Sequence, residues 1–331
     1  MQKNKKLLNM IYVLLALVVC ATVFCFCMVF LGDGKTDESS MQGQEEIVTH
    51  MDEDTTSDGR VETTQDSADT EGGCAFDSLV RGSNMMKTET VEINGVKAIL
   101  YFLDNYEKKP IVIVQHGLTS KKEDVKDLAT TIADLGYVVV TPDAAGHGEL
   151  KSNDRLSVMD MVEQTAGQFG QVLDYFQDSC YADVERTGLV GFSLGGLASF
   201  YYAGNGDRNP KIVVSLCSTP DFNDLTESQV AYQFYKNGKL VGAKNQEERK
   251  SIEEQIRSKS PYEKLLLDTD TYFFMVCGDA DDVVPHEGNM RFYEEMKDSS
   301  KEMKLTVKEK QKHEITEEDL MLVLNYLKSH L

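Results

Sequence analysis

Residues 191–196 read Gly-Phe-Ser-Leu-Gly-Gly, and they join an apolar run, 187–190, to a helix-forming segment, 197–203. A strand that passes into a helix within so few residues has to turn sharply, and the turn brings its flanking backbone close together. Glycine tolerates this approach because it has no Cβ, which accounts for a glycine two positions before and two positions after Ser193. The stretch therefore predicts a strand-turn-helix unit that holds the Ser193 hydroxyl clear of its neighbours.

Carboxylates gather after a second apolar run, downstream of Ser193. Residues 271–277 are predicted as a buried strand, and Asp279, Asp281 and Asp282 follow it directly. A serine hydroxyl becomes a nucleophile only when a base takes its proton, and a third group that orients the base completes the set. The Gly-x-x-Asp spacing favours Asp281 as that group, with Asp279 and Asp282 as alternatives.

The candidate base is His313. It lies on a loop between a predicted strand at 304–307 and a predicted amphipathic helix at 316–331. His286 is too close to the acidic segment to serve instead. Ser193, a carboxylate and His313 thus follow the chain order Ser, acid, His that accompanies this kind of turn.

A further strand end lies upstream of the turn. The apolar run 111–114 opens into Gln115-His116-Gly117-Leu118. A loop at this position offers backbone N–H groups that can bind an oxyanion. His116 is expected to shape this loop, and His147, which stands between two glycines, to fix a surface turn.

Together these pieces resemble the α/β-hydrolases, and among them the dienelactone-hydrolase-like and prolyl-oligopeptidase-like esterases. The matching pieces span about 200 residues in the family's order: His116-Gly117, residues 143–148, residues 191–196, Gly278-x-x-Asp281-x-x-Val284-Pro285 and His313. Relatives usually carry glycine immediately before the histidine, where this chain has Lys312. That departure puts the geometry of the histidine loop in question.

The resemblance implies a role for each matching position. Ser193 would be the nucleophile, Asp281 the orienting acid and His313 the general base. The backbone N–H groups of Leu118 and Leu194 would form the oxyanion hole. The reaction implied is two-step acyl transfer to water through an acyl-enzyme.

Charge excludes one class of partner. The 331 residues include 55 acidic and 34 basic side chains, for a formal net charge of -21. The range from Gly32 to Asp77 contains fourteen acidic residues and only two basic ones. Nucleic acid is therefore not expected as a partner, because its phosphates would be repelled. No metal-ligand spacing and no phosphate-binding loop occurs in the sequence, so no metal and no other cofactor is predicted.

The first residues predict a membrane anchor. Three lysines within residues 1–6 precede an uncharged, mostly apolar run from 7 to 31, and about 20 such residues suffice to span a bilayer. The positive-inside rule then places residues 1–6 in the cytoplasm and the rest of the chain outside the cell membrane. A lipid anchor at Cys20 is the alternative. Residues 32–77 are too polar to form a core and are predicted as an acidic, disordered linker.

Residues 78–331 are predicted as one α/β-hydrolase domain. Residues 88–93 and 96–103 flank Asn94-Gly95, which is a hairpin signal. Strands beginning near Ile111, Tyr137, Thr187, Ile212, Tyr272 and Lys304 then alternate with helices over 123–135, 157–178, 195–204 and 287–298. This alternation predicts a mostly parallel sheet with helices on both faces and its site at the carboxyl ends of the strands.

One segment interrupts the alternation. Residues 221–268 are charged and helical in pattern, and at this place they are predicted as a small helical cap over Ser193. Tyr232, Phe234 and Tyr235 are candidate substrate-binding residues within it, as is the neighbouring Leu240. Simple packing of a surface helical hairpin is the alternative for each of them.

The prediction from sequence is thus a membrane-anchored, extracytoplasmic serine hydrolase. Its substrate would be a small-molecule carboxylic ester, and its lipid contact would be made through residues 7–31. Two alternatives are a serine peptidase or amidase of the oligopeptidase-like branch and a catalytically silent surface-binding domain.

Overall fold

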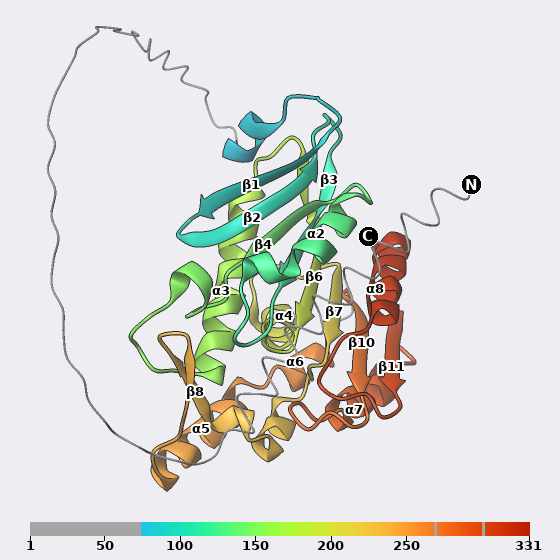
Figure 1. Cartoon of the computed structure of the whole chain (residues 1–331). Coiled ribbons are helices and arrows are strands. Elements are labelled where there is room, and N and C mark those ends of the chain that lie inside the picture. The colour runs from blue at the N-terminus through green and yellow to red at the C-terminus, as the bar shows by residue number, and fades with distance from the viewer. Residues whose placement is uncertain (1–73, 268–269, 300–301) are drawn as a thin grey trace, which may run out of the picture. The chain divides into compact units, whose positions relative to one another are not determined.

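The computed structural model describes residues 74–331 except 268–269 and 300–301. Within these residues an eight-stranded sheet runs in the order β1-β2-β4-β3-β6-β7-β10-β11 (Figure 1). Its strands are β1 (Met86–Ile93), β2 (Val96–Leu103), β3 (Lys109–Gln115), β4 (Val138–Pro142), β6 (Ala182–Phe192), β7 (Ile212–Leu216), β10 (Tyr272–Gly278) and β11 (Met303–Lys308). Neighbours from β4 to β11 are parallel, whereas β1 and β2 add to the sheet as antiparallel strands.

Helices cover both faces of this sheet. They are α2 (Lys126–Ala133), α3 (Val158–Phe176), α4 (Leu194–Asn205), α6 (Tyr262–Leu265), α7 (Glu287–Met296) and α8 (Glu317–His330). Alternate residues of one strand belong to different cores: in β3, Ile111 and Ile113 pack with α3 and α4, whereas Val112 and Val114 pack with α2 and α8. The period of two follows from the pleat of the strand. A parallel strand that is buried on both faces therefore reads as a continuous apolar run.

The predicted fold class is confirmed. Each strand expected from the apolar runs is present, and the Asn94-Gly95 turn joins β1 to β2 with a positive φ of 51° at Asn94 and 88° at Gly95. A two-residue hairpin turn of this type requires a left-handed backbone conformation at both of its central residues. The parallel strands place their carboxyl ends on one edge of the sheet, which is where the predicted site residues lie.

The folded domain begins earlier than the predicted boundary at residue 78. A 3₁₀ helix, Ala75–Leu79, buries Phe76, whose ring makes edge contacts with Phe102 and Phe176 at centroid distances of 5.0 and 5.2 Å. A carboxylate oxygen of Asp77 also accepts a hydrogen bond from the Cys180 backbone N–H. The prediction that the linker extends to residue 77 is wrong at this end, because one aromatic ring supplies enough apolar area to dock the segment.

The predicted cap is only partly helical. Between 3₁₀ turns and the helix α5 (Gln246–Lys259) it carries a hairpin of β8 (Gln233–Lys236) and β9 (Lys239–Gly242). This hairpin pairs with the short strand β5 (Leu156–Ser157) to make a second, three-stranded sheet. Apolar side chains of the cap pack against the first turn of α3 and against the start of α4. The cap thus lies next to Ser193, as its position in the sequence predicted.

The predicted cytoplasmic segment 1–6, membrane span 7–31 and most of the predicted linker lie outside the described residues. Among residues 74–331, with the two short gaps given above, none of the helices is long and apolar enough to cross a bilayer.

Candidate active site

Ser193 occupies a sharp turn between the end of β6 and the start of α4. Its backbone is strained, with φ 52° and ψ −113°, and its N–H donates to the carbonyl of Leu216 at 2.9 Å. A Cβ built on Gly191 would lie 2.2 Å from the carbonyl oxygen of Gly195, and one built on Gly195 would lie 2.4 Å from that of Gln115. The two glycines are therefore required by backbone contact, which is the reason the sequence pattern predicted this turn.

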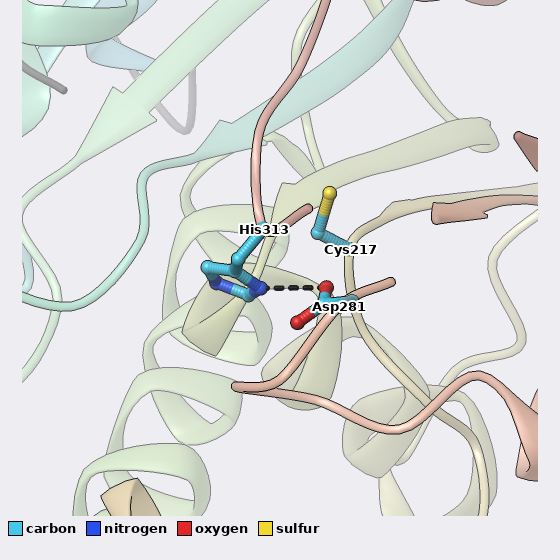
Figure 2. Close-up of side chains that lie close together, drawn as sticks. All are labelled: Cys217, Asp281 and His313. Carbon is cyan, nitrogen blue, oxygen red and sulfur yellow. Dashed lines mark hydrogen bonds and ion pairs between the residues drawn. The ribbon is translucent and has the colours of Figure 1, made fainter. Parts of the chain in front are cut away.

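His313 links Ser193 to Asp281. The His313 Nδ1 lies 2.8 Å from Oδ2 of Asp281, and its Nε2 lies 2.9 Å from Oγ of Ser193 (Figure 2 shows the first of these contacts). When Nδ1–H donates to the carboxylate, Nε2 is left as an acceptor for the serine hydroxyl. The structure thus brings the three predicted residues together in the arrangement that a serine nucleophile needs.

Asp281 is distinguished from its two neighbours by its surroundings. Its side chain is fully buried, and its Oδ1 accepts hydrogen bonds from the backbone N–H groups of Val283 and Val284, both at 2.9 Å. Asp282 is exposed, and Asp279 is also exposed and accepts from the backbone N–H of Lys310 at 2.5 Å. Among the three carboxylates, the one that contacts His313 is Asp281.

The histidine loop holds its shape without the expected glycine. Lys312 is exposed, and the neighbouring Gln311 fixes the loop instead. The Gln311 side-chain amide donates to the Glu314 carbonyl at 2.9 Å and to the Asp319 carboxylate at 3.1 Å. The backbone carbonyl of Gln311 accepts from the Ala280 N–H at 3.1 Å. Because these bonds join the loop to α8 and to the end of β10, the side chain at position 312 does not determine where His313 lies.

A small apolar cavity opens beside Ser193. Its volume is about 20 Å³, and its lining includes Leu118, Val158, Leu194, Leu197, Val230 and Val284. Leu194 is the first residue of α4, and the first N–H groups of a helix have no partner within it. Both leucines predicted to supply the oxyanion hole therefore border the space in front of the serine.

The three aromatic residues predicted to bind substrate do not line this cavity. The Tyr232 hydroxyl donates to the Thr226 carbonyl at 2.9 Å, and the ring of Tyr235 is buried against His147. Phe234 is covered by the guanidinium of Arg155 at 3.8 Å from the ring centroid. The three side chains make these contacts with other residues of the protein, and their assignment to substrate binding stays a prediction. Aliphatic residues such as Val230 line the cavity instead.

Comparison of the sequence with known protein families identifies the family of this chain. The prolyl oligopeptidase family, Peptidase_S9, matches residues 124–330, more than half of the chain. This chain belongs to the prolyl oligopeptidase family. As a member of that family the protein is a serine hydrolase, and the predicted superfamily and enzyme class are confirmed.

Individual proteins similar to this prolyl oligopeptidase family member include a sequence relative and solved structures. A Bacillus subtilis (strain 168) protein named "Putative esterase YitV" is 25% identical over 221 residues, which cover 64% of this chain and 85% of that protein. Among solved structures, TT1662 from Thermus thermophilus superposes with a TM-score of 0.55 at 17% identity and covers 74% of this chain and 98% of its own. The acylaminoacyl peptidase of Pyrococcus horikoshii gives 0.57 at 16% identity, with 75% of this chain and 41% of the peptidase covered.

A buried cysteine lies beside the histidine and the acid. Cys217 follows β7 with a positive φ of 50°, and its Sγ donates to the Glu314 carbonyl at 3.1 Å. One ligand-type atom each from Cys217, Asp281 and His313 lies within 4.8 Å of the others (Figure 2). Burial and the Asp281 carboxylate raise the pKa of the Cys217 thiol well above its ordinary value. The hydrogen bond from the Cys217 thiol to Glu314 ties the end of β7 to the histidine loop.

Sequence reasoning missed the role of His147. The prediction of a surface turn is wrong, since the His147 side chain is completely buried and stacks on the Tyr235 ring at a centroid distance of 4.1 Å and an angle of 8°. Its Nε2 accepts from the backbone N–H of Thr119 at 3.1 Å, and its Nδ1–H donates to the Ala145 carbonyl at 2.9 Å. Thr119 has a positive φ of 66° and follows Leu118 directly. His147 therefore connects the cap to the loop that is predicted to supply an oxyanion N–H.

The stability of this connection is expected to depend on pH. Burial lowers the pKa of His147 to about 4 from an ordinary 6.5. Between these values the unfolded chain binds a proton that the folded chain does not, so stability falls on acidification through this window. From pH 8 to pH 5 the loss should be about 2 kcal/mol. Urea unfolding of the full chain at both pH values measures it.

The matched variants are His147→Gln and His286→Gln. A glutamine at position 147 can still accept from the Thr119 N–H but does not titrate, so this variant should lose less stability between pH 8 and pH 5 than the wild type. His286 is partly exposed at the start of α7, and its replacement should leave in place the pH dependence that His147 contributes. An unchanged pH dependence in His147→Gln would contradict the assignment.

Proposed function

We propose that this protein hydrolyses carboxylic esters, with Ser193 as nucleophile, His313 as general base and Asp281 as the acid that orients it. The observation that carries the proposal is the continuous hydrogen-bonded chain from Ser193 Oγ through His313 to the buried Asp281 carboxylate. A serine, a base within hydrogen-bond reach and a third group that orients the base form the general signature of nucleophilic catalysis.

In this mechanism His313 Nε2 takes the hydroxyl proton as Ser193 Oγ attacks the ester carbonyl. The negative charge that develops on the carbonyl oxygen is stabilised by the backbone N–H groups of Leu118 and Leu194. The imidazolium, held by Asp281, gives its proton to the departing alcohol. Water, activated by the same histidine, then releases the acyl group from Ser193.

Two comparisons favour an ester over a peptide bond. The relative of which 85% is covered carries the name of an esterase, whereas this chain covers only 41% of the acylaminoacyl peptidase. A peptidase or amidase of the same family remains the second candidate, because the Ser-His-Asp arrangement serves both reactions. A silent binding domain is disfavoured by the intact hydrogen-bonded chain.

The test of this function is a panel of nitrophenyl esters run against aminoacyl-naphthylamides with the full-length protein. We expect hydrolysis of the esters and little or no cleavage of the amides. A fluorophosphonate probe, which reacts with an activated serine, should label the wild type. Amide cleavage that exceeds ester cleavage would contradict the ester assignment, and an unlabelled, inactive protein would contradict the enzyme.

We further propose that residues 7–31 anchor this hydrolase in the cell membrane with residues 1–6 in the cytoplasm and the catalytic domain outside. The support is the uncharged run of 25 residues behind three lysines. Positive charge before an apolar span favours its retention on the cytoplasmic side. The acidic residues 32–73 would then extend between membrane and domain, because like charges repel one another.

Removal of residues 1–31 should therefore release an active enzyme from the membrane fraction. The described residues form the apolar cores of the domain without this segment, so kcat/KM on a nitrophenyl ester should stay within about twofold of the full chain, as expected when no contact to the site is lost. Fractionation followed by an ester assay measures both. A truncated protein that still sediments with membranes, or that loses activity, would contradict the anchor.

A further inference from the structure

The cavity beside Ser193 is small enough to restrict the substrate. Its volume of about 20 Å³ is between one and two times what a single water-sized probe occupies. A methyl group, or at most an ethyl group, fills such a space. A longer alkyl chain does not fit inside this space unless it pushes aside side chains of a packed apolar core, including Leu194 and Leu197.

The position of the cavity identifies the part of the ester that enters it. Its described lining includes Ser193 and the two leucines proposed to supply the oxyanion N–H groups, but His313 is not part of it. The departing alcohol must lie within reach of His313 Nε2, because that nitrogen protonates its oxygen. The alcohol therefore leaves on the histidine side, and the cavity on the other side takes the acyl group.

The chemistry of the lining restricts the acyl group further. Apart from Ser193, the described side chains around the cavity are aliphatic except for Ser228, which is buried and already accepts from the Val230 N–H at 3.2 Å. Burying a charged or unpaired polar group among such side chains is costly. A carboxylate or an ammonium on the acyl group would find no charged partner there.

On these grounds we propose that the enzyme is specific for esters of the shortest uncharged acids, acetate and propionate. This inference rests on the proposed ester hydrolysis. It assigns the acyl subsite to the space between α4, the start of α3 and residues 228–231 of the cap. The alcohol side is not restricted by this cavity.

A chain-length series tests the inference. The full-length protein is assayed with nitrophenyl acetate, propionate, butyrate, hexanoate and octanoate, and kcat/KM is compared. Overpacking by one or more methylenes is unfavourable, so kcat/KM for hexanoate should be at least about tenfold lower than for acetate. Equal or faster hydrolysis of hexanoate or octanoate overturns the inference and leaves the proposed ester hydrolysis standing. Absence of hydrolysis of every ester overturns both.

A pair of matched variants locates the subsite. Val230→Ala removes two methyl groups from a half-buried residue of the lining, and the ratio of hexanoate to acetate kcat/KM should rise by about tenfold, one overpacking step. Val241→Ala makes the same change at the exposed edge of β9 and should leave the ratio unchanged. A ratio that stays the same in Val230→Ala, or rises equally in both variants, overturns the assignment. If Val230→Ala does not fold, the wild-type series still decides.

Discussion

Ser193→Ala should lower kcat for ester hydrolysis by about 10⁶-fold, while the full-length protein keeps its circular dichroism spectrum and its unfolding midpoint close to wild type. Without the hydroxyl no acyl-enzyme can form, and only binding and the oxyanion N–H groups remain to assist water. The folded state loses the Ser193–His313 hydrogen bond, which is worth about 1 kcal/mol. Steady-state kinetics on a nitrophenyl ester, together with the loss of fluorophosphonate labelling, measure the effect.

Ser199→Ala is the matched control. Ser199 lies in α4, the helix that follows Ser193. It is fully buried and donates to the Gly195 carbonyl at 2.8 Å, so its replacement also removes one buried hydroxyl. It does not contact His313, and its variant should retain activity within a few-fold. Turnover near wild type by a folded Ser193→Ala protein would exclude the proposed nucleophile.

Asp281→Asn should have the second-largest effect, a fall in kcat of about 10⁴-fold. An asparagine can keep accepting from the Val283 and Val284 N–H groups through its carbonyl oxygen. Its NH₂ group would then face Nδ1 of His313, where it can only donate. The imidazole would carry its proton on Nε2, and the nitrogen that should take the serine proton would be blocked.

The neighbouring carboxylates provide the comparison. Asp282→Asn changes an exposed side chain, and Asp279→Asn leaves an oxygen to accept from the Lys310 N–H. Both variants should stay within about threefold of wild-type kcat, as surface changes away from the site do. If Asp282→Asn lost more activity than Asp281→Asn, the acid would have to be moved by one position.

What could be predicted from the sequence was fixed by local backbone geometry. Gly191 and Gly195 are needed because backbone atoms lie within 2.4 Å of where their Cβ atoms would be, and a requirement of this kind leaves a readable pattern around Ser193. The continuous apolar runs likewise revealed parallel strands, since each is buried on both faces. The catalytic roles of Ser193, Asp281 and His313 stay predictions until the variants above are measured.

What could not be predicted depends on contacts between distant segments. Tyr235 stacks on His147 because the cap hairpin pairs with β5. The paired strands are almost 80 residues apart in the sequence, and no local sequence pattern predicts such a pairing. Phe76 packs against the domain because its ring contacts the rings of Phe102 and Phe176. Gln311 holds the histidine loop through hydrogen bonds to α8 and to the residue Ala280 after β10. The replacement of the family's usual glycine by Lys312 therefore affects the loop less than the sequence suggested.

Three residues other than glycine hold a positive φ around the site: Thr119, Ser193 and Cys217. Each such backbone costs about 1–2 kcal/mol and persists only where its surroundings enforce it. Heat resistance and catalytic power are therefore opposed at this edge of the sheet. A glycine at any of the three positions would relax the chain but would release a loop that aligns reacting groups. Engineering for thermal tolerance should therefore begin away from these three positions.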